Sequence, residues 1–405
     1  MLLLILSALL YAHAERKPNQ KSESESVPAV RISVAPLGYS PPSAAYMSYR
    51  FSSASLSFLD ADHLLFTFRT AGLLKRLPDD PPEDEDQNIH AVVLNIATGK
   101  AEREIDWRMH DHERYLWMLS GGRFLVRVRN ALFLSDSSLQ LNPYLASSTK
   151  LRAVQLSPDR SRLLVEAEKT EEPQPIAGDE SAAPKKTKML KIVILKTETR
   201  EALVASESRR PVAIPMVAEG FIEAIPGKEN GEWIIRQVPF KGDPKIIAEI
   251  KSACDPTITM LNGSVALTSS CSRNSGDNHQ VTAVSSDGRQ LWQQWWESRY
   301  VWPTYEYAEN GRRFAFSSLQ VNRALGTFEP VESSDVVAQM VGIFDVETGK
   351  LAFVKTATPI LSAGQNYALS ADGRRFAILR EGAIEIYDLP PVSVPESLPA
   401  ETSKR

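Results

Sequence analysis

The sequence predicts an all-β fold in which seven four-stranded antiparallel sheets form a closed ring. Three observations lead to this prediction. A strand–turn–strand motif recurs along the chain, its copies follow a regular period, and signals for helix are few. A fixed period of this kind indicates a row of similar structural units that bury their apolar faces against one another.

The repeated motif is an apolar strand, a Ser or Glu, a small turn with Asp or Asn and usually Gly, an Arg, and a second apolar strand. Its three clearest copies are residues 156–164, 307–315 and 369–377. A second motif, with a Thr-Gly-Lys turn between two strands, occurs at 93–100 and 343–350. Gly in these turns supplies the positive φ that a tight hairpin requires. Together the two motifs give four antiparallel strands per unit.

The period of the motif predicts seven units. We expect their first strands near residues 55, 115, 151, 212, 256, 304 and 366, and three insertions, at 71–89, 170–188 and 322–337. Without the insertions each unit falls near the ~40–50 residues of a propeller blade. The chain from 29 to 391 is therefore predicted to be one seven-bladed β-propeller.

The last unit has only three clear strands, at 366–370, 375–380 and 383–389. A fourth apolar alternation lies at 30–34, at the other end of the chain. We expect this N-terminal strand to complete the last blade and close the ring, because closure removes two exposed sheet edges. The alternative is a free N-terminal arm.

The turn sequences resemble those of WD-repeat, YVTN and quinoprotein-like β-propellers over roughly residues 50–390. The stretch Asp287-Gly288-Arg289-Gln290-Leu291-Trp292 looks like one docking repeat of the quinoprotein type. The Trp-Asp and Gly-His pairs of true WD repeats are absent from the sequence. The resemblance therefore implies the fold and no enzyme class.

The first fourteen residues have the apolar run and the small-x-small ending, Ala12-His13-Ala14, of a secretory signal peptide. We expect cleavage after Ala14 and a secreted or periplasmic protein; the alternative is an uncleaved anchor. The polar segments 15–28 and 392–405 are expected to be disordered tails. Elsewhere in the sequence no apolar run approaches the ~20 residues of a membrane span.

Net charge and missing motifs exclude several classes of partner and activity. The net charge of −4 gives no general attraction to nucleic acid. The sequence lacks the Gly-x-Ser-x-Gly elbow of hydrolases, the glycine loops that hold phosphates and the Cys pairs of zinc sites. We therefore expect no cofactor, no metal and no nucleic-acid partner, and a monomer that meets a protein, peptide or carbohydrate. Catalytic residues cannot be assigned.

All three insertions are expected between the second and third strands of their blades, and hence on one face of the ring. Binding residues concentrate on loops held by a rigid scaffold. The links between blades reach the same face, and the link at 298–304 lies in an aromatic-rich stretch. Its members Trp296, Tyr300 and Trp302 are candidate ligand-binding residues, because dense aromatics form stacking platforms. The alternative is packing between blades.

A second link on that face, at 108–114, contains His110 and His112. In extended chain the two imidazoles of a His-x-His sequence point the same way, which suits ligand or metal binding. A third metal ligand cannot be assigned, so a solvated link is the alternative.

The two cysteines, Cys254 and Cys271, are expected to form a disulfide, as is common in exported proteins. Asn262-Gly263 predicts a two-residue hairpin loop that sets Leu261 opposite Ser264. Continued pairing places the cysteines directly opposite each other, with Cα atoms ~4.5 Å apart. The alternative is two buried thiols.

Two functions remain open. The first is an exported binding scaffold that uses the insertion-bearing face. The second is a hydrolase, a lyase or a quinone-dependent oxidoreductase with its site in the central funnel. Carboxylates, His or Arg that converge in the funnel would favour an enzyme, and an apolar or water-filled channel would favour binding.

Overall fold

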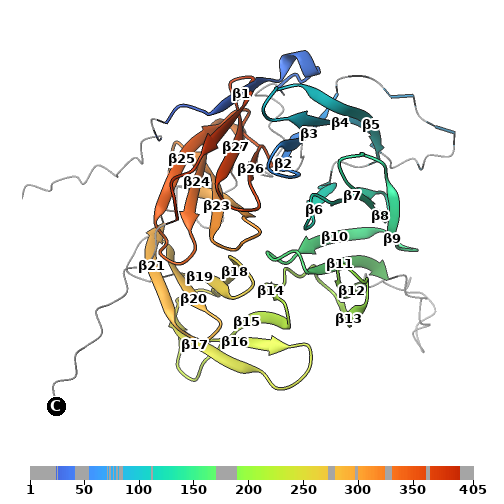
Figure 1. Cartoon of the computed structure of the whole chain (residues 1–405). Helices are drawn as coiled ribbons and strands as arrows, with labels where there is room; N and C mark the ends of the chain where they lie inside the picture. Colours follow the sequence, from blue (N-terminus) through green and yellow to red (C-terminus); the bar gives the residue numbers. More distant parts are fainter. Residues whose placement is uncertain are drawn as a thin grey trace, which may run out of the picture.

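The protein forms a ring of seven four-stranded sheets around a central axis in a computed structural model (Figure 1). The structure describes residues 24, 26–41, 54–70, 72, 74–75, 77–78, 81, 85–110, 113–169, 189–271, 279–296, 300–323, 331–361 and 365–392. The first strand of each blade lies nearest the axis and the fourth at the periphery. The prediction of a seven-bladed β-propeller is confirmed.

The blades follow one another along the chain. Blades 1 to 3 consist of β2 (Ala54–Phe58), β3 (His63–Arg69), β4 (Gln87–Asn95) and β5 (Ala101–Met109); β6 (Leu116–Met118), β7 (Phe124–Val128), β8 (Ala131–Ser135) and β9 (Asn142–Ala146); and β10 (Leu151–Leu156), β11 (Arg162–Lys169), β12 (Met189–Lys196) and β13 (Ala202–Ser208).

Blades 4 to 6 consist of β14 (Met216–Val217), β15 (Gly220–Pro226), β16 (Glu232–Pro239) and β17 (Lys245–Lys251); β18 (Thr257–Met260), β19 (Val265–Cys271), β20 (His279–Ser285) and β21 (Gln290–Trp296); and β22 (Tyr300–Tyr307), β23 (Arg313–Val321), β24 (Val336–Asp345) and β25 (Leu351–Ala357). Two single-turn 3-10 helices, η1 (Ala35–Leu37) and η3 (Ser333–Asp335), are the helical elements among the described residues.

Blade 7 joins the two ends of the chain. Its strands are β26 (Tyr367–Leu369), β27 (Arg375–Arg380), β28 (Ala383–Asp388) and, in fourth position, β1 (Val30–Ser33). β1 pairs with β28 in antiparallel register, with Val30 opposite Ile386 and Ser33 opposite Ala383. The predicted closure by an N-terminal strand is therefore confirmed, and the alternative of a free arm is wrong.

The repeated turn motif folds alike in different blades. In blade 3 the Ser157 hydroxyl donates to Asp159 and accepts from the Arg162 amide, and Ser370 does the same with Asp372 and Arg375 in blade 7. The residue after the turn Asp or Asn has positive φ. It is Gly373 in blade 7, at 67°, and Gly311 in the equivalent turn of blade 6, at 69°. Blade 3 has Arg160 there, at 59°. A non-glycine residue in this conformation is uncommon.

The apolar core lies between neighbouring blades. Blades 1 and 7 share a cluster in which Phe66 and Leu94 meet Leu379 and Ile384. Ile32 of β1 belongs to the same cluster and is 4% exposed. The strand that closes the ring, β1, therefore also contributes to the buried core between blades 1 and 7.

The three long connections run from β3 to β4, from β11 to β12 and from β23 to β24. Each joins the second strand of a blade to the third. In antiparallel blades these connections and the links between blades leave the ring at the same end, which we call the insertion end.

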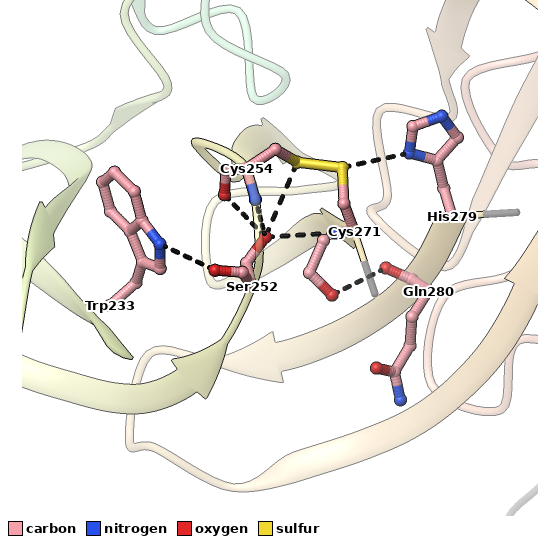
Figure 2. The surroundings of a disulfide bond; sticks show 7 residues. Trp233, Ser252, Cys254, Cys271, His279 and Gln280 are labelled. Carbon is pink, nitrogen blue, oxygen red and sulfur yellow. Dashed lines mark hydrogen bonds between the residues drawn. A yellow bond between two sulfur atoms is a disulfide. The ribbon is translucent and has the colours of Figure 1, made fainter. Parts of the chain in front are cut away.

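The predicted disulfide between Cys254 and Cys271 is present (Figure 2). The register behind that prediction is wrong by one residue, because Leu261 pairs with Val265 and Thr257 lies opposite Ser269. Asn262 Oδ1 accepts hydrogen bonds from the amides of Ser264 and Val265, which makes the turn one residue longer.

Cys254 precedes β18 and therefore lies outside the ladder, and its Cα is 5.6 Å from that of Cys271. The buried Ser252 fixes this link: its hydroxyl donates to the Cys254 carbonyl and accepts from the Cys271 amide. The Trp233 indole of blade 4 donates to the Ser252 carbonyl. The disulfide thus ties the link between blades 4 and 5 to the second strand of blade 5.

Deletion of residues 1–34 removes β1 and bares the edge of β28. We expect the free energy of unfolding to fall by about 3 kcal/mol or more, because Ile32 and Val34 lose their buried positions. Thermal denaturation with light scattering measures the loss and any edge-to-edge aggregation. Deletion of residues 1–23 is the control and should leave the midpoint unchanged. Equal midpoints for both deletions would contradict a closing role for β1.

Candidate functional site

The predicted aromatic site lies at the joint between blades 5 and 6. Trp296 is the last residue of β21, and its ring centroid is 4.2 Å from that of Phe316 and 6.3 Å from that of Phe344. Trp296 therefore packs between blades. It also lines a cavity of about 590 Å³ between the same two blades.

The wall of this inter-blade pocket is largely apolar and aromatic. Its main lining residues are Trp295, Trp296, Pro303, Tyr305, Phe316 and Met340. Trp295 is 53% exposed, although it lines the cavity. His279 lines it as well, at the start of β20. The start of β20 and the end of β21 both lie at the insertion end, so His279 and Trp296 form the part of the pocket wall at that end.

Two residues fix the packing beside the pocket. The Trp292 indole packs between the blades and donates to the Val346 carbonyl at 2.7 Å. Gly342 lies in the pocket wall, where a Cβ would come within 2.8 Å of the Phe344 ring, so glycine lets this ring pack against the strand. Burial raises the pKa of Tyr305 well above its usual range, and its hydroxyl forms a hydrogen bond with the side chain of Thr259.

The other two predicted aromatics lie in a different element from the one expected. Tyr300 and Trp302 belong to strand β22, and not to a link, and β22 has an irregularity between Val301 and Thr304. Their side chains lie outside the described residues. Of the three predicted aromatics, the structure therefore places Trp296 in the pocket wall.

His110 lies in a cluster of charges away from this pocket. Its Nδ1 is 2.7 Å from Asp86 Oδ1 and 3.2 Å from Arg129 Nη2, and Arg108 also pairs with Asp86. Asp86 and Arg129 thus occupy the Nδ1 side of the ring. His112 lies outside the described residues. Among the described residues no three His, Cys, Asp or Glu side chains are grouped to hold a metal ion.

The sequence did not reveal the residues that line a second cavity, which lies on the axis of the ring in the central funnel. It has a volume of about 340 Å³ and is lined by first strands or adjacent residues of blades 1, 2, 3, 6 and 7. Its charged residues are Arg114, Arg160 and Glu306, with Tyr307 and Tyr367 beside them. Arg160 Nη2 is 3.9 Å from Glu306 Oε1, and its Nη1 is 3.4 Å from Glu309 Oε2.

Enclosure by protein changes the proton affinity of these groups. Desolvation raises the pKa of the Glu306 carboxyl, and Arg160 and Arg114 oppose that shift. Desolvation also lowers the pKa of Arg114, although this side chain is exposed. Both observations fit a side chain in an open cavity with protein around it. A carboxyl and two guanidinium groups thus converge in the funnel, which is the arrangement that favours the enzymatic alternative.

Comparison with known proteins gives distant structural likenesses alone. No family model and no curated protein matches the chain. Among solved structures, the acylaminoacyl peptidase of Pyrococcus horikoshii matches at 12% identity and a TM-score of 0.45, over 80% of this chain and 49% of that one. The chain thus spans about half the length of that peptidase.

Two other matches are smaller proteins or domains. The WD40 domain of Toxoplasma gondii coronin matches at 8% identity and a TM-score of 0.42, over 86% of this chain and 84% of that one. TolB from Acinetobacter baumannii matches at 13% identity and a TM-score of 0.34, over 80% of this chain and 76% of that one. Likenesses this distant say nothing of ligand or activity. The seven four-stranded sheets of the chain themselves confirm the resemblance to β-propellers at the level of the fold.

Two neighbouring tryptophans test the geometry of the inter-blade pocket. Trp296→Ala should lower the free energy of unfolding by about 2 kcal/mol or more, because the ring packs on Phe316. Trp295→Ala should change it by only about 0.5 kcal/mol, because Trp295 is largely exposed. Denaturant unfolding measures both. Equal losses would contradict the division of roles between the two rings.

Proposed function

We propose that the protein is an exported β-propeller that binds a protein, peptide or carbohydrate ligand at its insertion end. The observation that carries the proposal is the aromatic pocket between blades 5 and 6, whose wall includes His279 and Trp296 at that end. Tyr300 and Trp302 belong to the proposed site through their place at the start of β22.

The pocket has the properties of a ligand site. Its volume falls in the ~300–1,000 Å³ range of such sites, and an apolar wall with a few polar groups is their usual lining. Tyr305, His279 and Ser318 supply those polar groups. Flat aromatic faces accept a proline ring or the apolar face of a sugar, because both stack without a demand for exact hydrogen bonding.

Export is supported by the disulfide, because such bonds persist in oxidising compartments. The expected signal peptide, 1–14, lies outside the described residues. Among the described residues, no helix is long and apolar enough to span a bilayer. Secretion or periplasmic location, cleavage after Ala14 and a monomeric state remain part of the proposal.

The axial cavity favours a second candidate function, a hydrolase, a lyase or an oxidoreductase. A carboxyl with a raised pKa, as Glu306 has, is suited to exchange a proton near neutral pH. Arg114 and Arg160 are suited to hold a negative charge. If the axial cavity is an active site, Glu306→Gln should abolish turnover and leave ligand binding between blades 5 and 6 intact.

The binding proposal is tested by selection followed by substitution. The purified protein is screened on a glycan array and with a random peptide library, and the dissociation constants of the best ligands are measured by calorimetry. Trp295→Ala should weaken the ligand about tenfold or more, as loss of an aromatic contact does. Ile246→Ala, at an equally exposed apolar residue of blade 4, should leave it unchanged.

Ligands that bind both variants as tightly as the parent would place the site elsewhere and refute the pocket. A screen in which neither library yields a saturable ligand would refute the proposed ligand classes.

A further inference from the structure

The axial cavity has a feature that packing between blades does not require. Arg160 occupies the turn position where blades 6 and 7 have glycine, and it adopts the positive φ of that position. Its guanidinium donates to the Leu119 carbonyl of blade 2 and reaches Glu306 and Glu309 of blade 6. An uncommon backbone conformation therefore brings a charge to the axis.

Arg114 approaches the same cavity from the link before β6. Its Nε donates to the Leu116 carbonyl at 3.1 Å, and its guanidinium carbon is 5.6 Å from the centroid of the Trp117 ring. These contacts fix the plane of the guanidinium at the cavity wall. A guanidinium held in one plane presents paired donors that match a carboxylate.

The charges at the cavity balance only while Glu306 is ionised. Among the described lining residues two are guanidinium groups, Arg114 and Arg160, and one is a carboxyl, Glu306. Glu309 adjoins them and lies 3.4 Å from Arg160, whereas Glu306 is 3.9 Å from Arg160. Within the described part of the chain, the carboxylate that acts on the charge of Arg114 is Glu306. When Glu306 is protonated, the positive charge of Arg114 therefore remains for a single anionic group.

We infer that the axial cavity is a second ligand site, for a small molecule with one carboxylate group, which Arg114 binds and Glu306 regulates according to pH. Leu56, Leu116 and Trp117 border the cavity, although each is at most 4% exposed. A ligand with two negative charges fits less well, because one guanidinium faces it and Glu306 lies nearby. This site is independent of the pocket between blades 5 and 6.

The sign of the pH effect follows from Glu306. The groups that act on it are Arg114, Arg160, Tyr307 and Tyr367, of which only the two arginines carry charge at neutral pH. Ionised Glu306 repels a carboxylate and competes for Arg114. Desolvation raises the pKa of Glu306, so the carboxyl is still partly protonated at pH values where an ordinary Glu is ionised. Binding should therefore be tighter at low pH and weaken as Glu306 ionises.

The experiment uses the whole protein, with butyrate as the probe and butyramide as its neutral isostere. Saturation-transfer NMR titrations give the dissociation constants from pH 6 to 8, where butyrate itself stays ionised, at constant ionic strength. Butyrate should bind saturably and butyramide should not. Arg114→Gln should weaken butyrate about tenfold or more, and Arg114→Lys should weaken it less.

Glu306→Gln should strengthen butyrate binding at pH 7 and remove most of its pH dependence. Two controls should leave it unchanged: Arg374→Gln, at an exposed arginine outside the cavity, and Trp295→Ala, in the other pocket. The controls separate this inference from the proposed function, because only the pocket of blades 5 and 6 needs Trp295.

Equal binding of the acid and the amide would overturn the inference, as would binding that survives in folded Arg114→Gln. Weaker binding in Glu306→Gln would show that Glu306 holds the ligand, and would equally overturn its regulatory role. Saturable binding of inorganic phosphate without binding of butyrate would replace the carboxylate with a different ligand class.

Discussion

Pairing of β1 with β28 is the interaction on which the rest of the structure depends. The apolar clusters that join the blades lie between neighbours, so each joint has a defined width only when the ring is closed. Backbone hydrogen bonds extend the pairing at both ends, from the Ala29 amide to the Ile386 carbonyl and from the Val34 amide to the Gly382 carbonyl. A strand from one chain end thus holds the other end and fixes the spacing of both cavities.

Closure also explains why the two cavities differ in chemistry. The joint between blades 5 and 6 is a contact between two sheet faces, so its pocket inherits large apolar side chains. The stacked rings of Phe314 and Phe344, 5.3 Å apart, are the packed part of the same joint. The axial cavity is lined by first strands and turns, whose polar side chains meet across the axis. Apolar and charged ligand sites therefore arise from one architecture.

The sequence predicted the repeated strand–turn–strand units, but it did not predict which residues from different blades meet in the closed ring. The blades are recognisable in the sequence from the turn motif of Ser157 and Ser370, because this motif forms its hydrogen bonds within a few residues. The hairpin register failed at Asn262, where a side chain accepts two backbone amides and lengthens the turn. The Asn-Gly pair alone does not determine whether the turn has two residues or three.

Residues 114, 160 and 306 come from three blades, and only the closed ring brings them together. The one signal in the sequence was Arg160 in a glycine position of the repeat. The aromatic stretch was recognised from its density, but residues 298–304 were expected in a link, whereas β22 already begins at Tyr300. Pro303 is accommodated at an irregularity of the strand, where the regular pairing is interrupted.

The central claim is that the joint between blades 5 and 6 is a binding site. Crystals soaked with aromatic, pyranoside and proline-amide fragments test it most directly, because an occupied pocket is seen whatever the natural ligand is. The account predicts fragments between Trp296, Tyr305 and Phe316. Crystals in which this pocket stays empty, while the same fragments occupy other surfaces, would contradict it.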